Sequence, residues 1–318
     1  MEIILINTIK MPNNIKEIKT KKFVWLDITG ATQDNLKYLK QEFGFDSADL
    51  GDCLPTKQRQ KIHQRTDYLF MILQFPYFNR EAKTIEAAEV DIFISKKFFI
   101  TIHEDELNPL IDFFQMYQSD QIMRSQLSNE TALDIMHKLL NKLYLYCYPI
   151  LNHINLDINQ IEYDVLEQPE EKAIMNILMI KRNIVNFQKT MQSHRGILQK
   201  FLEITFDWRP RKMDNDYNVL ITHTKDIWDY LTNFKDTINA LHETQASMIS
   251  LKINEIMKTL TIFSVIVFPL TLLAAIFGMN TMNAMPFANS QYDFWYIMGI
   301  MLMGAVIMFG FFKKKRWL

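Results

Sequence analysis

The chain has 318 residues, a formal net charge of −1 and a charged fraction of 22%. Because it is nearly neutral, it has no general attraction to nucleic acid, which is not expected as a partner. Its two cysteines, Cys53 and Cys147, exclude a disulfide framework or a paired-cysteine metal site, so reduced thiols in a cytosolic environment are expected.

Residues 1–127 predict a mixed α/β domain. Runs rich in β-branched and aromatic residues predict strands, and two helical patterns predict helices at 33–43 and 108–117. The expected strands are 2–9, 22–28, 68–75, 88–95 and 97–103.

Residues 128–212 predict long antiparallel helices. Ser128 is the expected N-cap of the first, which continues at three- and four-residue apolar spacing to a Gln-Pro break at 168–169. The second is expected over about 170–204, ahead of the next break at 207–210.

A very long helix is expected next, because no proline occurs from Asp214 until Pro269 and no glycine until Gly278. A stalk helix at 213–259 would then be continuous with an apolar helix at 260–280, over about 100 Å. A helix of that length needs a partner surface.

Two uncharged runs near the C-terminus predict membrane-spanning helices. Residues 260–279 are long enough to cross a hydrocarbon core of about 30 Å. The second run, 294–312, begins with Trp295 and Tyr296, whose rings favour a membrane interface. A hairpin buried in a soluble protein is the alternative, but two such runs are hard to bury in so small a chain. The expected class is therefore an α+β membrane protein.

The flanking charges predict the orientation of these helices. Lys252 and Lys258 precede the first run, the tail at 313–318 is basic, and the loop at 281–293 has no Lys or Arg. The positive-inside rule places both termini in the cytoplasm and the loop outside. We expect two spans in a cell inner membrane or plasma membrane, with lipid as a partner.

A stripe of mostly small or polar residues runs from the stalk into the first apolar run. Both close helix packing through small residues and a wetted lumen explain such a stripe within a bilayer. Glu243 and Asn254 favour the lumen, because a dry seam would favour apolar residues. Two membrane helices cannot enclose a pore, so a lumen predicts a cyclic homo-oligomer. The two series are Glu243, Ser250, Met257, Ser264, Thr271 and Gly278, and Ser247, Asn254, Thr261, Phe268 and Ala275.

The tripeptide GMN at 278–280, after the first of two C-terminal apolar helices, resembles the signature of the CorA magnesium channels. The resemblance extends over NEIMKTLTIFSVIVFPLTLLAAIFGMN (254–280), RQKIHQRTDYLFMIL (59–73) and the terminal FFKKKRWL. It implies a homopentamer with a funnel-shaped cytoplasmic domain that admits Mg²⁺ and often Co²⁺ or Ni²⁺. It also implies a ring of five Asn280 side chains at the external mouth.

The resemblance implies that Gly278, Met279 and Asn280 form a selectivity filter. Mg²⁺ releases its water shell reluctantly, and uncharged amide oxygens can bind those waters without removing them. A carboxylate ring would hold the ion more firmly, whereas conduction needs binding weak enough for release. No cofactor is expected beyond Mg²⁺ as cargo or regulator.

The resemblance also assigns positions along the pore. Met257 and Leu260 match a hydrophobic constriction, Asn254 and Thr271 match polar pore positions, and Glu243 matches an acidic position in the stalk lumen. The expected pore-lining set is Glu243, Ser250, Asn254, Met257, Leu260, Ser264, Phe268, Thr271 and Ala275.

Three features depart from the family pattern. Phe268 precedes the membrane proline where relatives often have methionine, and Phe287 stands where they commonly have an acidic residue. Val219 and Thr222 occupy a stalk segment in which some relatives carry aspartates that sense cytoplasmic Mg²⁺.

Asp49 and Asp52 are candidate ligands of a regulatory metal between subunits, and an acidic helix face is the alternative. His103-Glu104 and His242-Glu243 lack the second histidine of a zinc protease motif, and no phosphate-binding or nucleophile motif occurs, so no enzyme is expected.

Two other functions remain open. Zinc transporters of the same superfamily typically carry isoleucine where this chain has Met279. A membrane-anchored sensory protein would need neither the stripe nor GMN.

Overall fold

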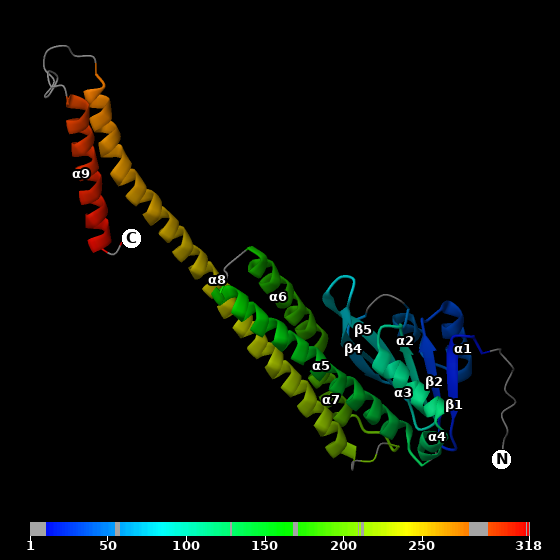
Figure 1. Cartoon of the computed structure of the whole chain (residues 1–318). Coiled ribbons are helices and arrows are strands. Elements are labelled where there is room, and N and C mark those ends of the chain that lie inside the picture. Colours follow the sequence, from blue (N-terminus) through cyan, green and yellow to red (C-terminus); the bar gives the residue numbers. More distant parts are fainter. Residues whose placement is uncertain are drawn as a thin grey trace, which may run out of the picture. The chain divides into compact units, whose positions relative to one another are not determined.

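The computed structural model describes residues 11–54, 58–127, 129–167, 171–208, 210, 213–279, 292–315 and 317. It contains two compact units, Met1–His242 and Glu243–Leu318 (Figure 1). The strand expected at 2–9 lies outside the described residues.

A six-stranded mixed sheet forms the centre of the first unit (Figure 1). β2 and β6 are parallel neighbours, and all other neighbouring strands are antiparallel. Because β2 and β6 are parallel, their carboxyl ends lie side by side at the same end of the sheet. There the Gly30 amide donates to the His103 carbonyl at 2.9 Å. The spatial order is β1 (Ile15–Lys19), β2 (Val24–Thr29), β6 (Phe98–His103), β5 (Thr84–Ile94), β4 (Leu69–Asn79) and β3 (Lys61–Gln64).

Helices cover both faces of the sheet. On one face Leu39 of α1 (Gln33–Phe43) and Leu50 of α2 (Ser47–Asp52) join a buried cluster with Phe93 of β5. On the other face Trp25 of β2 packs edge-on against Phe114 of α3 (Asn108–Ser119). Because both faces are buried, the central strands have apolar runs instead of a strict polar–apolar alternation.

The strands expected at 22–28 and 97–103 are confirmed as β2 and β6. β4 and β5 are longer than expected, because they pair along their whole length from Leu69 opposite Ile94 to Asn79 opposite Thr84. β1 and β3 were not predicted. Both lie at edges of the sheet, and their sequences, IKEIK and KIHQ, are largely polar or charged.

α1 spans the predicted residues because its ends are encoded locally. Thr32 and Asn35 form a reciprocal cap at its start, and Gly44 ends it in the left-handed region at φ 71°. α3 is also confirmed, whereas the short α2 and α4 (Gln121–Leu127) were not predicted.

α5 (Ala132–Glu167) is the first of the expected long helices. The expected N-cap, Ser128, lies outside the described residues. A reciprocal cap forms at Thr131, whose hydroxyl accepts from the Asp134 amide while the Asp134 carboxylate accepts from the Thr131 amide. The regular helix therefore begins later than expected.

The single helix expected over 170–204 is wrong, because the chain turns at residues 192–193. It forms α6 (Glu171–Met191) and α7 (His194–Glu203). The His194 ring is fully buried, lying 2.9 Å from the Tyr144 hydroxyl and 2.7 Å from the Gln74 carbonyl oxygen. These distant partners fix the start of α7. The spacing of apolar residues in the sequence does not predict such contacts.

The uninterrupted helix predicted from Asp214 is confirmed as α8 (Asp214–Phe277), which contains Pro269 without ending there. It stops three residues before the predicted end. Its first part belongs to the core of the first unit, where the Tyr217 hydroxyl donates to the Leu133 carbonyl at 3.1 Å. The second apolar helix is α9 (Asp293–Lys314).

Candidate functional site

The predicted pore-lining residues share one side of α8. At 3.6 residues per turn, all nine lie within about 60° of Met257 around the helix. Eight are exposed and Ser264 is half-buried, with Met257 55% and Phe268 72% exposed. The described chain therefore leaves this stripe without a covering element of its own.

Ile262 marks the opposite side of the same helix. It is only 5% exposed and lies about 140° from Met257 around the helix. Within the second unit, the buried part of this helix therefore faces away from the stripe.

The hydroxyl groups of the stripe donate hydrogen bonds back into the helix. Ser250 bonds to the Ala246 carbonyl at 3.0 Å, Ser264 to Leu260 at 2.9 Å and Thr271 to Val267 at 2.9 Å. Each hydroxyl proton is therefore engaged, and the oxygen keeps its acceptor lone pairs. Such a surface suits groups that donate hydrogen bonds, including the water shell of a cation.

Gly278 lies in the turn that ends α8. The Gly278 amide donates to the Ala274 carbonyl at 2.9 Å, and the Met279 amide donates to Ile276 at 3.2 Å, which tightens the last turn. A Cβ added at Gly278 would lie 3.1 Å from the Ala274 oxygen. Asn280, the third residue of the predicted filter, lies outside the described residues.

Both apolar helices are long enough to cross a membrane. The apolar window of α8 is 6% buried and that of α9 is 0% buried. Trp295 and Tyr296 are exposed at the start of α9. A core helix of a soluble protein would bury such a window, so the buried-hairpin alternative is not supported.

The sequence profile described as CorA-like Mg²⁺ transporter protein matches residues 20–314. The chain belongs to this family. CorA-like proteins are membrane ion transporters and not catalytic enzymes, in agreement with the expectation that this chain is no enzyme.

Individual relatives match almost the whole CorA-like chain. It is 27% identical over 295 residues to the cobalt/magnesium transport protein CorA of Thermotoga maritima, covering 92% of this chain and 83% of that protein. The complete CorA magnesium transporter of Methanocaldococcus jannaschii shares the fold with a TM-score of 0.81, at 20% identity over 95% of this chain and 94% of that one.

The cytoplasmic domain of ZntB from Vibrio parahaemolyticus shares part of this CorA fold. Its TM-score is 0.60 at 11% identity, over 73% of this chain and 89% of that one.

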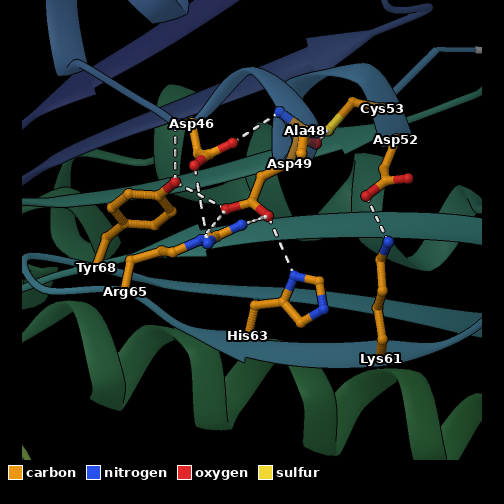
Figure 2. Close-up of polar contacts among 9 residues, drawn as sticks. All are labelled: Asp46, Ala48, Asp49, Asp52, Cys53, Lys61, His63, Arg65 and Tyr68. Atoms are coloured by element: carbon orange, nitrogen blue, oxygen red, sulfur yellow. Dashed lines mark hydrogen bonds and ion pairs between the residues drawn. The ribbon is translucent and has the colours of Figure 1, made fainter.

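Asp49, a candidate regulatory ligand, is fully buried and bound by basic and polar side chains (Figure 2). Arg65 donates to both carboxylate oxygens, at 2.8 and 2.6 Å, and Tyr68 donates at 2.8 Å. Nδ1 of the half-exposed His63 lies 3.1 Å from the carboxylate. Burial would raise the pKa of Asp49, but hydrogen bonds from Arg65, His63 and Tyr68 hold it below its usual range.

Asp52, the second candidate, is ion-paired with Lys61 (Figure 2). The described residues contain no group of three His, Cys, Asp or Glu side chains placed to hold a metal ion. The acidic-face alternative does not describe Asp49 either, because its carboxylate is buried and paired. The regulatory metal role of these two aspartates stays a prediction.

The departures at Val219 and Thr222 lie on the first part of α8. Val219 is 52% exposed, and the Thr222 hydroxyl donates to the Asn218 carbonyl at 3.0 Å. Neither side chain offers a carboxylate to a cation.

An acidic cavity that was not predicted from the sequence lies beside the carboxyl ends of β2 and β6. The signal was present in AEVDIFI, where Glu89 and Asp91 alternate with buried apolar residues. On a sheet with two buried faces, this alternation places carboxylates inside the protein.

Proposed function

We propose that this chain forms a homopentameric channel that carries Mg²⁺, and also Co²⁺ or Ni²⁺, through a pore lined by α8. The observation that carries the proposal is the stripe from Glu243 to Ala275, exposed, mostly small or polar and aligned along one side of an apolar helix. Cobalt and magnesium are the ions named for the Thermotoga relative.

The chemistry of the stripe fits a hydrated cation. Its hydroxyl protons are engaged by the helix, so its oxygens are available to accept hydrogen bonds from shell waters. Mg²⁺ holds its shell tightly, and a surface of neutral acceptors can guide the hydrated ion without trapping it.

A pore formed by one side of one helix needs several copies around an axis. Met257 and Leu260 would form rings of apolar side chains at a constriction, and Phe268 would form a wider ring further along. Asn280 would close the series at the external mouth, with both chain termini in the cytoplasm as the basic flanks suggest.

Liposome uptake of Mg²⁺ by Asn280→Ala tests the filter directly. Removing the amide ring should abolish selective flux, while Asn289→Ala, a matched change in the same loop, should leave it intact. Undiminished and equally selective flux through Asn280→Ala would exclude the proposed filter.

The same liposome assay tests whether the protein carries Zn²⁺ instead of Mg²⁺. Met279→Ile introduces the residue typical of the zinc transporters, and Zn²⁺ uptake is measured beside Mg²⁺ uptake. Wild-type protein that carries Zn²⁺ but not Mg²⁺ would favour the zinc function. Protein that carries neither ion would favour the anchored sensory role.

A further inference from the structure

The first unit contains a cavity of about 340 Å³ at the carboxyl edge of the β2–β6 pair. It is bounded by the middle of β5, the end of β6 with the residues after it, and the segments that follow β2 and α2. Its lining residues are Ala31, Cys53, Leu54, Ala88, Glu89, Asp91, Ile102, His103, Glu104 and Glu106. The volume is roughly ten times the 30 Å³ share of one liquid water molecule.

The lining is acidic. It contains four carboxylic acids, and its described residues include no lysine or arginine. His103 contributes no free positive charge, because its Nε2 lies 3.2 Å from the Asp27 carboxylate while Nδ1 lies 2.6 Å from the Glu104 carbonyl oxygen. A cation is the occupant that this charge balance favours.

Asp91 supplies a second, independent observation. Its side chain is buried, with 4% of the residue exposed, and its Oδ1 atom accepts no hydrogen bond from any described residue. Buried polar atoms are almost always bonded, so an unbonded carboxylate oxygen lining a cavity indicates a missing partner.

The charges around Asp91 also favour a cation in the cavity. Burial, with Glu89 and Asp52 nearby, raises the pKa of Asp91 well above its usual range. A hydrogen bond from Cys53 lowers this pKa, and so does Lys61, which is itself paired with Asp52. A cation in the cavity would compensate the same charges.

We propose that this cavity binds a divalent cation that keeps part of its water shell, with Asp91 as the buried anchor. No three described His, Cys, Asp or Glu side chains converge closely enough to hold a bare ion. Mg²⁺ commonly binds through one or two carboxylates while several waters remain on the ion. The volume of the cavity accommodates those waters.

This site is separate from the proposed pore and requires neither transport nor oligomerisation. It joins β5, through Glu89 and Asp91, to the segment after β6, through Glu104 and Glu106. Neither Asp49 nor Asp52 lines it.

Iron-directed cleavage of the full-length protein in detergent tests the proposal. Fe²⁺ replaces Mg²⁺, ascorbate and hydrogen peroxide generate radicals at the bound ion, and mass spectrometry locates the cuts. We expect cuts near residues 89–91 and 103–106, suppressed by excess Mg²⁺.

Asp91→Asn and Glu106→Gln should each weaken this cleavage about tenfold or more, because each removes a charged acceptor of shell water. Asp112→Asn is the matched control, since Asp112 is exposed on α3 and does not line the cavity. Absent cuts, cuts insensitive to Mg²⁺, or cuts unchanged in both variants would each overturn the proposal. The cleavage assay reports where an ion binds, and the liposome assay reports Mg²⁺ flux. A failure of the cavity proposal can therefore be told apart from a failure of the proposed channel function.

Discussion

At the scale of single residues, the first unit uses its ionisable side chains mainly as buried links. Asp49 joins α2 to β3 and the turn after it through His63 and Arg65, although it was expected as a metal ligand. His194 joins α5 to β4 through Tyr144 and the Gln74 carbonyl. Such links tie the stability of the unit to pH.

His194 makes the unit sensitive to acid. Burial lowers its pKa to about 4, below the value of about 6.5 for an unfolded chain. The stabilisation from its neutral form is complete above pH 6.5 and is lost as pH falls towards 4. The loss should be about 3 kcal/mol, because each pKa unit corresponds to about 1.4 kcal/mol.

Thermal unfolding of the full chain in detergent, followed from pH 7 to pH 4, measures this loss. His194→Gln should be less stable at pH 7 but should show a flatter pH dependence. His153→Gln, at an exposed position of α5, should retain the wild-type slope. An identical slope in wild type and His194→Gln would contradict the assignment.

The pKa of His103 is shifted upwards, opposite to that of His194, so His103 does not make the unit sensitive to acid. Burial opposes its charge, but the Asp27 carboxylate raises its pKa. Its stabilisation is therefore present below about pH 6.5 and is lost as pH rises through the raised pKa.

At the scale of elements, α8 combines two roles in one uninterrupted helix. Its first part is fixed by core contacts such as Leu220 and Ile227, and its later part presents the stripe. Pro269 donates no hydrogen bond to the Val265 carbonyl, but the helix continues through it. The lost bond makes this turn a local weak point beside Phe268.

Gly278→Ala tests the end of α8. The added Cβ would lie 3.1 Å from the Ala274 oxygen, so the last turn must give by a few tenths of an ångström. We expect Mg²⁺ uptake by liposomes to fall severalfold. Gly299→Ala in α9 is the matched control, because no described atom outside the backbone of α9 itself lies within 4 Å of its added Cβ. Equal uptake by both variants would show that the close approach at Gly278 is unimportant for conduction.

At the scale of the whole molecule, the stripe and the apolar helices remain exposed in a single chain. Met257, Leu260 and Phe268 are each more than half exposed. Such exposure of large apolar side chains to water is unfavourable in a monomer. Lipid can cover the outer apolar surface, and further copies of the chain can enclose the stripe.

Native mass spectrometry of the detergent-solubilised protein tests the assembly. We expect a mass about five times the 37.8 kDa of one chain. Asp105→Asn, which alters only an exposed carboxylate, should give the same mass. A monomer or a dimer would exclude an axial pore lined by this stripe.

Much of this organisation was predictable from local sequence. The ends of α1, the uninterrupted course of α8 and the two apolar helices follow from caps, the absence of helix breakers and composition. β2 and β6 were predictable for a similar reason, because their apolar runs are long and bounded. The predicted stripe lies on one side of α8 because helical periodicity alone places its residues there.

Contacts between distant residues decided the rest. The break between α6 and α7 accompanies the contacts of His194 with Tyr144 and Gln74, fifty and 120 residues away. β1 and β3 are polar segments that form strands only because they pair with β2 and β4.

The sequence by itself determined the CorA-like family, the two apolar helices and the candidate filter, because these depend on composition, periodicity and a short motif. Only the tertiary structure decided that Asp49 is buried against Arg65 and that Asp91 lines an acidic cavity. Burial and charge pairing depend on which side chains meet after folding, and a one-dimensional pattern does not specify those neighbours.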